Sequence, residues 1–245
     1  MRGLFITLEG IDGSGKSTQR ELLARELRRR GLDIVVTREP GGTAIGEGIR
    51  HLMVSDATSH IAPTTELLLY VAARAQHVAE LIRPALEKGR NVVSDRYTDS
   101  TVAFQGYGRG LDLMMIEELN SFATGGLKPD LTIVFDLDPE MARTRQGSRP
   151  IGGLLGAFDE QHSEFHERMR IGYFQMAQQE TSRIRIVDAS GAVEDTHSKV
   201  MELVLPVLDS NTASSASSAV DFQHCSRKTA EDAEDAADTM PDDTL

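Results

Sequence analysis

The sequence predicts an α/β domain with a five-stranded parallel sheet between two layers of helices. Five short runs are apolar and rich in β-branched residues, and the longer stretches between them carry apolar side chains at helical spacing. Strands that alternate with helices along a chain pair in parallel through right-handed crossovers. We therefore expect a doubly wound, three-layer domain whose ligand crevice lies at the carboxyl ends of the strands.

The five predicted strands are short and mostly apolar throughout, as expected for strands that are buried on both faces. They are Leu4–Leu8, Ile34–Thr37, Asn91–Ser94, Leu131–Phe135 and Ile184–Val187. The predicted helices are Ser17–Arg29, Thr64–Ile82, Met114–Ala123 and Glu164–Gln179. We expect Pro84 to kink or restart the helical stretch that precedes it, and residues 147–156 to form a glycine-rich break.

The composition is typical of a globular protein inside a cell. Of the 245 residues, 40% are hydrophobic and 26% are charged, which excludes collagen-like and wholly disordered classes. The single cysteine, Cys225, excludes an intramolecular disulfide framework and fits a reducing compartment. Apolar stretches are too short to span a bilayer, and a formal net charge of −12 argues against a general nucleic-acid binder. We expect a cytoplasmic protein that binds neither a membrane nor a nucleic acid.

Residues 210–245 differ in composition from the rest of the chain. They hold eight acidic and two basic residues, so half of the formal net charge of −12 lies in this segment. The segment has almost no large apolar side chains and cannot bury enough surface to offset the entropy of ordering. We expect a folded domain over residues 1–209 and a disordered, acidic, Ser/Ala-rich tail over residues 210–245.

The most specific motif lies between the first predicted strand and the first predicted helix. Residues 10–17 read GIDGSGKS, which fits the pattern GxxxxGK[ST] of a phosphate-binding P-loop. Backbone N–H groups of such a loop and of the following helix point at phosphates. Lys16 would supply a positive charge to the β- and γ-phosphates of ATP, and the Ser17 hydroxyl would bind Mg²⁺. The predicted ATP-binding residues are Gly10, Ile11, Asp12, Gly13, Ser14, Gly15, Lys16, Ser17 and Thr18.

A carboxylate follows the third predicted strand, where it would face the P-loop. Asp95 ends the run NVVSD at the carboxyl edge of the sheet, so we expect it to be the second Mg²⁺ ligand, either directly or through water. A cap on the following helix is the alternative interpretation of Asp95.

Several unusual segments occur together and in one order. They are LEGIDGSGKST at 8–18, TREPGGT at 37–43, YVAARAQH at 70–77, SDRYTDSTVAFQGYGRG at 94–110, KPDLTIVFDLDPE at 128–140 and FHERMRIGY at 165–173. In these segments the chain resembles the bacterial thymidylate kinases, which have a P-loop NTPase-type fold with a lid segment. The resemblance extends from Met1 to about Asp209, and the lid would fall at about residues 147–160.

This resemblance implies transfer of the γ-phosphoryl group of ATP to dTMP, with Mg²⁺, as a step of dTTP biosynthesis by a homodimeric enzyme. Arg38 and Arg96 would hold the acceptor phosphate, Tyr70 would stack on the thymine, and Arg74 would donate a hydrogen bond to it. Spacing alone is also compatible with a core aromatic and a solvated arginine at the last two positions. The residues expected to bind dTMP are Asp12, Arg38, Tyr70, Arg74, Arg96, Ser100, Thr101 and Gln105, and Glu9 would support them.

The predicted lid is the segment where the sequence departs from the family. Members without an arginine in the P-loop usually carry catalytic arginines in the lid, and residues 11–14 contain no arginine. The family's Asp-Arg pair falls on Gly156 and Ala157, so we expect Arg149, supported by Arg145, to stabilise charge on the migrating phosphoryl group. Surface charges without a catalytic role are the alternative for both arginines. The predicted catalytic residues are thus Lys16, Arg149, Arg145 and Asp95.

Other functions remain open at this point. The chain could phosphorylate another nucleoside monophosphate or a deoxynucleoside, or it could be a catalytically weak nucleotide-binding protein because of its altered lid. A guanine-nucleotide switch is disfavoured, because the sequence has no Asn-Lys-x-Asp element for guanine selection.

Overall fold

The computed structural model describes residues 2–55, 61–146 and 160–211. Residues Met1–Val204 belong to one unit, and the second unit, Leu205–Leu245, is described only for residues 205–211, which are helical. The predicted tail therefore lies outside the described residues, apart from positions 210 and 211. The glycine-rich break at 147–156, with Arg149, also lies outside them, as does the predicted lid at about 147–160 except for Glu160, the first residue of helix α8 (Glu160–Gln179).

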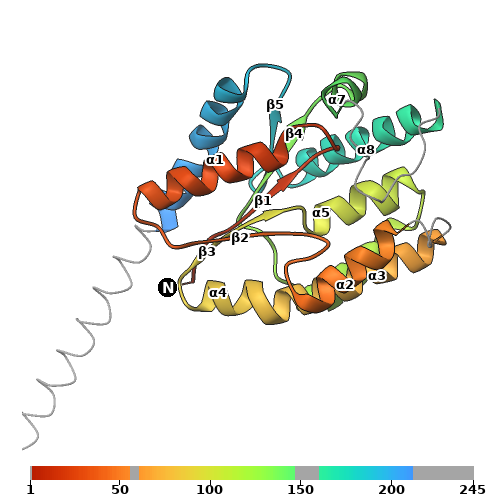
Figure 1. The fold of residues 1–245 in the computed structure, drawn as a ribbon, viewed down its shortest axis with the longest axis horizontal. Coiled ribbons are helices and arrows are strands. Elements are labelled where there is room, and N and C mark those ends of the chain that lie inside the picture. The colour runs from red at the N-terminus through yellow and green to blue at the C-terminus, as the bar shows by residue number, and fades with distance from the viewer. Residues whose placement is uncertain (1, 56–60, 147–159, 212–245) are drawn as a thin grey trace, which may run out of the picture. The chain divides into compact units, whose positions relative to one another are not determined.

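Five parallel strands form one sheet in the order β2-β3-β1-β4-β5 (Figure 1). The strands are β1 (Phe5–Glu9), β2 (Ile34–Arg38), β3 (Asn91–Asp95), β4 (Leu131–Asp136) and β5 (Ile184–Asp188). Every residue of β1 and β3 is buried, as the sequence analysis expected for strands that are covered on both faces. The predicted fold class is confirmed, and each predicted strand agrees with an observed one to within a residue at each end.

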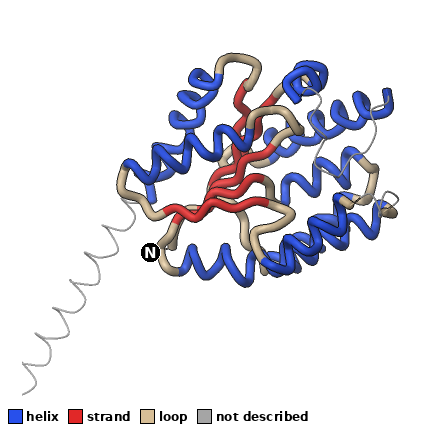
Figure 2. Tube along the Cα trace, viewed as in Figure 1, coloured by secondary structure: helices blue, strands red, loops and turns tan. Residues whose placement is uncertain are grey.

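Helices cover both faces of the sheet (Figure 2). The α-helices are α1 (Lys16–Arg29), α2 (Ala44–Val54), α3 (Pro63–His77), α4 (Arg83–Glu87), α5 (Thr98–Thr101), α6 (Leu113–Thr124), α7 (Pro139–Gln146) and α8 (Glu160–Gln179). Two π-helical segments, η2 (Val78–Ile82) and η3 (Val102–Gly108), continue α3 and α5, and residues 193–204 are also helical. None of the helices within the described ranges is long and apolar enough to cross a membrane.

The helical prediction is wrong in two places. The single helix predicted over Thr64–Ile82 is α3 followed by π-helical η2. The restart expected at Pro84 is confirmed, because α4 begins one residue before it. Proline has no N–H to continue the hydrogen-bond ladder, which accounts for the wider turn that precedes it. Helix α2 was not predicted, although the Thr43 side chain caps it by accepting a hydrogen bond from the Gly46 N–H at 3.0 Å. That threonine before an amphipathic run was the available signal.

A buried ion pair anchors the short helix α5 to the sheet. Asp99 accepts hydrogen bonds from Arg183 Nη1 at 2.7 Å and Nη2 at 2.9 Å, and from the Thr132 hydroxyl of β4 at 3.0 Å. The Arg183 guanidinium also reaches Glu180, which is more exposed. These bonds hold the first turn of the helical segment that α5 and η3 form beside the carboxyl edge of the sheet.

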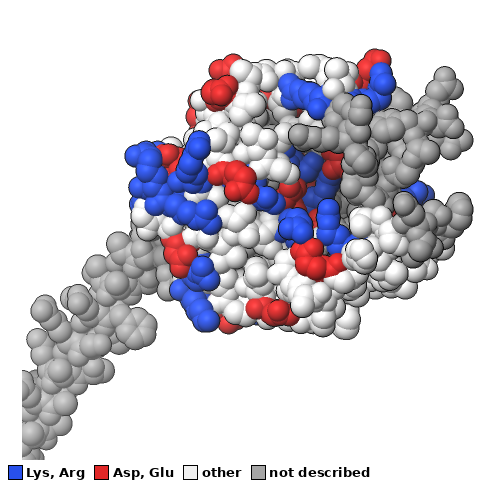
Figure 3. Space-filling view, viewed as in Figure 1, with Lys and Arg blue, Asp and Glu red and all other residues white. Residues whose placement is uncertain are grey.

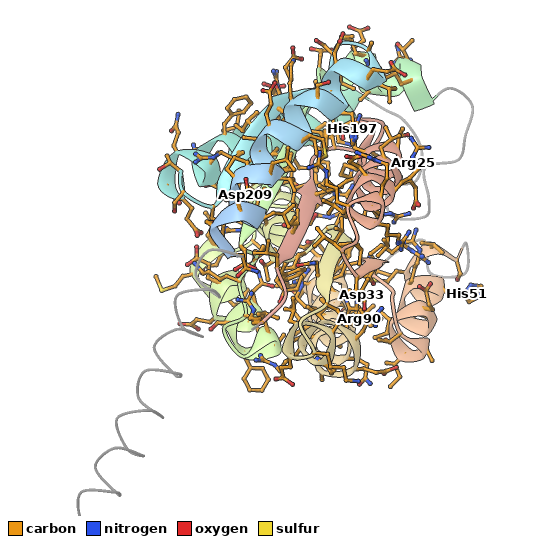
Figure 4. The ribbon with its side chains drawn as sticks, turned by 90° about the vertical axis from the view of Figure 1, so that its left-hand side faces the viewer. Arg25, Asp33, His51, Arg90, His197 and Asp209 are labelled. Atoms are coloured by element: carbon orange, nitrogen blue, oxygen red, sulfur yellow. The ribbon has the colours of Figure 1, made fainter. Side chains whose placement is uncertain are left out.

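We expect Asp99→Ala to lower the free energy of unfolding by about 2 kcal/mol, because the buried guanidinium of Arg183 keeps only Glu180 as its carboxylate partner. The matched control is Asp33→Ala, which breaks the exposed pair of Asp33 with Arg90 (Figure 4) and should leave stability unchanged. Urea unfolding followed by circular dichroism measures both variants. Equal stabilities of the two variants would contradict this role of Asp99.

Candidate functional site

The loops at the carboxyl ends of the strands line a cleft of about 730 Å³. The P-loop, the segment after β2, the end of β3 and the loop after β5 all contribute to it, as the alternation of strand and helix predicts. In the space-filling view, basic and acidic side chains lie close together around the hollowed part of the face (Figure 3). The lining residues beyond the predicted ATP-binding segment 10–18 are Gln19, Arg20, Arg38, Glu39, Arg50, Asp95, Arg96, Arg145, Ala189, Gly191, Ala192, Val193 and Thr196.

The P-loop presents free donors to this cleft. Gly15, with φ of +93°, precedes the first residue of α1, and no side chain caps the helix, so the N–H groups of the first turn remain available to an anion. Lys16 is buried, and its Nζ donates to the carbonyls of Gly10 at 2.9 Å and Ile11 at 2.7 Å. Burial, and next the charge of Arg96, lower the pKa of Lys16 to about 8. Negative phosphates beside Lys16 would raise that pKa again.

Ser17 and Asp95 lie together at the head of α1. The Ser17 hydroxyl donates to Asp95 Oδ2 at 3.0 Å, and α5 begins after Tyr97 without a side-chain cap. Asp95 therefore does not cap the following helix, which removes the alternative interpretation. A hydroxyl and a carboxylate are oxygen donors of the kind that Mg²⁺ prefers.

A second, smaller cavity adjoins the cleft, and we call it the inner cavity. It is lined by Asp12, Glu39, Pro40, Arg50, Tyr70, Arg74, Arg96, Ser100, Thr101, Phe104 and Gln105. Seven of the eight residues predicted to bind the acceptor thus come together there. The exception is Arg38, which lines the larger cleft, is 45% exposed at its side chain, and donates to Glu47 at 2.8 Å. Its contact with the acceptor phosphate stays a prediction.

Arg96 lies where the two cavities meet. Its Nη2 donates to Asp12 Oδ1 at 2.5 Å, and its Nη1 donates to the Gly10 carbonyl at 3.1 Å. Burial raises the pKa of Asp12, but Arg96 and Lys16 outweigh it and lower that pKa to about 2. The backbone of Arg96 has φ of +75°, a left-handed conformation that costs a non-glycine residue free energy and is typical of functional sites.

Arg74 is buried, which excludes a solvated arginine at this position. Its Nε donates to Glu39 Oε2 at 2.8 Å, its Nη1 to Asn120 Oδ1 at 2.6 Å and its Nη2 to the Tyr97 carbonyl at 3.0 Å. Tyr70, one helical turn earlier on α3, lines the same cavity. Arg74 therefore holds the wall of the inner cavity together, and its hydrogen bond to the thymine stays a prediction.

Glu39 is a functional residue that the sequence analysis did not assign. Besides Arg74, it accepts from His77 Nδ1 at 3.0 Å, and His77 Nε2 lies 2.7 Å from the Thr37 hydroxyl. Gly42, with φ of +80°, packs against this imidazole, since a Cβ at position 42 would lie 2.6 Å from His77 Nε2. The Pro-Gly-Gly turn is therefore needed for close packing, a constraint that its sequence alone indicates only as a turn.

Arg50 was also missed, because helix α2 was not predicted. It lines both the cleft and the inner cavity, and its Nη1 donates to the Pro40 carbonyl at 3.3 Å. A guanidinium in this position adds positive charge where the two cavities join.

Arg145 of α7 lines the cleft beside the loop after β5. Its Nη1 donates to the Ala189 carbonyl at 2.7 Å and its Nη2 to the carbonyls of Ser190 at 2.8 Å and Gly191 at 3.4 Å. These contacts position the loop after β5, and the supporting catalytic role expected for Arg145 stays a prediction.

Glu9 connects three parts of the site. The carboxylate accepts from the Tyr97 N–H at 2.7 Å, from the Ser100 hydroxyl, and from the Tyr173 hydroxyl of α8 at 3.0 Å. Burial, and next the charge of Asp99, raise the pKa of Glu9 from 4.5 to about 7. The supporting hydrogen bonds that the sequence analysis expected of Glu9 are therefore present.

Comparison with known proteins assigns this architecture to a family. Residues 8–200 match the family model described as thymidylate kinase. The chain belongs to the thymidylate kinase family. It is 46% identical over 205 residues to a thymidylate kinase of Exiguobacterium sp., covering 84% of this chain and 95% of that one. It is 50% identical over 194 residues to one of Pseudomonas putida, covering 79% and 91%.

A solved structure agrees with the family assignment. The crystal structure of thymidylate kinase from Ehrlichia chaffeensis superposes with a TM-score of 0.67 at 32% identity, covering 83% of this chain and 99% of that chain. The resemblance drawn from the sequence motifs is confirmed.

The raised pKa of Glu9 makes stability depend on pH. Between pH 4.5 and about 7 the folded chain keeps a proton on Glu9 that the unfolded chain has released, so rising pH lowers the free energy of unfolding over this range. Glu9→Gln removes this dependence. From near pH 5 to near pH 8 the variant should gain about 3 kcal/mol in stability relative to the native chain.

Chemical denaturation of both proteins at the two pH values measures this change. The comparison between the two proteins cancels the titration of every group that does not interact with Glu9. A stability difference that is the same at both pH values would show that Glu9 has an ordinary pKa.

Proposed function

We propose that the chain transfers the γ-phosphoryl group of ATP to dTMP, giving dTDP and ADP, as a step toward dTTP. The observation that carries this proposal is the junction of the P-loop cleft with the inner cavity, where Asp12, Arg50 and Arg96 line both. Two nucleotides bound in the two cavities would bring their phosphates together at this junction. Membership of the thymidylate kinase family supports dTMP as the acceptor.

The reaction needs positioned positive charge more than a base. An acceptor phosphate oxygen is ionised at neutral pH and attacks the γ-phosphorus, which forms one P–O bond and breaks the bond to the β-phosphate oxygen. Lys16 and Arg96 both donate to the Gly10 carbonyl, so they supply positive charge side by side, and the first turn of α1 adds backbone donors. Catalysis by Arg149 belongs to the same proposal, and it lies outside the described residues.

Ser17 and Asp95 would hold Mg²⁺, because their oxygens lie 3.0 Å apart beside the P-loop. Across the described residues, no group of three His, Cys, Asp or Glu side chains could hold a metal on its own. Phosphates and water would complete the coordination, as is usual for Mg²⁺. The ion, when bound, neutralises negative charge on the β- and γ-phosphates.

The inner cavity fits a pyrimidine base. Tyr70 offers an aromatic face, and Arg74 offers donors from the same helix. The Thr101 hydroxyl is buried and has no hydrogen-bond partner within the described ranges, which supports a ligand contact there. Ser100 contributes indirectly, because its hydroxyl donates to Glu9.

Oligomeric state and location complete the proposal. Exposed apolar side chains lie on three helices, at Ile45 and Leu52 of α2, Leu68 of α3, and Met114 and Phe122 of α6, and they support a homodimer. The use of ATP and dTMP supports a cytoplasmic location.

The acceptor is tested by comparing dTMP, dUMP, dCMP and thymidine with [γ-³²P]ATP. Within this assay we expect Lys16→Ala to lower turnover at least about 100-fold, because the γ-phosphoryl group loses a positioned charge. The control is Lys128→Ala, an exposed lysine paired with Glu180, which should retain native turnover. Native turnover in Lys16→Ala would remove Lys16 from the reaction.

The contacts of Arg145 predict a separate effect. In Arg145→Ala, the loop after β5 loses three hydrogen bonds to its carbonyls, so the KM for ATP should rise about tenfold while kcat changes less than about threefold. Steady-state kinetics at saturating dTMP distinguish the two constants. A fall in kcat at constant KM would support the catalytic role instead.

A further inference from the structure

Glu66 is a buried carboxylate beside the inner cavity for which the reaction has no direct use. It lies on α3, one helical turn before Tyr70, and is 6% exposed. Its Oε1 accepts from Gln105 Nε2 at 2.6 Å, and its Oε2 accepts from Arg109 Nη2 at 2.8 Å. Both partners come from the η3 segment or the residue that ends it.

The contact with Glu66 decides which end of the Gln105 amide faces a ligand. An amide has a donor nitrogen and an acceptor oxygen, whereas a carboxylate only accepts. Arg109 only donates, so both oxygens of Glu66 act as acceptors. Gln105 must turn its nitrogen toward Glu66, which leaves its oxygen Oε1 as the atom available to the inner cavity that Gln105 lines.

We propose that Glu66 is a specificity-determining positioning residue, which makes the inner cavity select pyrimidines that carry an N3–H. This inference rests on the proposed function, because it takes the inner cavity as the base site. Thymine and uracil have a donor at N3, which Gln105 Oε1 accepts. Cytosine has a lone pair at N3, which would face that oxygen and leave two acceptors unpaired.

Arg74 favours the same bases from its own position in the cavity wall. A guanidinium only donates, so it pairs with the O4 of thymine and opposes the amino group of cytosine. The cavity therefore combines a side chain that only donates with an amide whose oxygen is fixed toward the ligand. Mispairing of buried polar groups discriminates strongly between ligands of similar shape.

Glu66→Gln tests the proposal with almost no change of shape. Arg109 would still donate to the oxygen of the new amide at position 66. The nitrogen of that amide would then point at Gln105. Gln105 would turn its oxygen toward that nitrogen and present its own NH₂ to the ligand. We expect the ratio of kcat/KM for dTMP to that for dCMP to fall at least about tenfold, and the ratio of dTMP to dUMP to stay constant.

The matched control is Arg109→Lys, which disturbs the same cluster but keeps the carboxylate. Its ratio of kcat/KM for dTMP to that for dCMP should stay native.

Gln105→Met is a second test, because it removes the acceptor oxygen and leaves Glu66 paired with Arg109. That variant should lose affinity for dTMP and keep its affinity for dCMP. Thermal unfolding identifies the variants that fold, so each ratio is read on folded protein.

Isothermal titration calorimetry with dTMP and dCMP separates this inference from the proposed function. If the native chain binds dTMP but transfers no phosphate, the proposed function fails and the affinity ratio still tests Glu66. An equal loss for dTMP and dCMP in Glu66→Gln, or a native ratio in folded Gln105→Met, would overturn the inference and leave Glu66 as a packing residue.

Discussion

Charged groups can be buried at the carboxyl edge of this sheet only because each one forms an ion pair or hydrogen bonds with a neighbouring group. Arg96 makes the contacts on which this part of the structure depends. Its guanidinium binds Asp12 and the Gly10 carbonyl, which shapes the P-loop before any nucleotide arrives. An unpaired buried charge costs several kcal/mol, whereas a paired one with satisfied hydrogen bonds is tolerated. The strained backbone of Arg96 is the cost of placing the guanidinium between the two cavities.

The networks around Glu9, Glu39 and Asp99 extend the same principle away from the phosphates. Each buried carboxylate collects donors from segments that are distant in the chain: Glu9 from α8, Glu39 from α3, and Asp99 from the residues before β5. Packing alone would leave the short helix α5 and the turn after β2 with several possible positions. Each carboxylate needs its own set of hydrogen-bond donors, and only one position of α5 and of the turn after β2 brings all of these donors together. The side chains that face the cavities are therefore held in place before a ligand binds.

Much of this molecule is predictable from its sequence, and the exceptions have physical causes. Strand runs are buried on both faces, so their apolar composition identified all five, and the P-loop pattern located Lys16 and Ser17. Helix α2 was missed because its signal is a single capping threonine before a short amphipathic run. Glu39, Arg50 and Glu66 were missed because their roles depend on tertiary contacts, which no local pattern encodes. These contacts join the turn after β2 to α3, α2 to that turn, and α3 to η3. Arg74 illustrates the difference, since spacing placed it beside Tyr70 but only the fold shows that three of its donors are already used.

The clamp of Arg145 on the loop after β5 has an electrostatic consequence. Peptide carbonyls carry the negative end of a dipole, and three of them lie where a nucleotide polyanion would approach. Because these oxygens accept hydrogen bonds from Arg145, they face a guanidinium, which keeps its positive charge at this rim of the cleft. A chain with a strong overall excess of acidic residues thereby offers its anionic substrates an entrance that does not repel them.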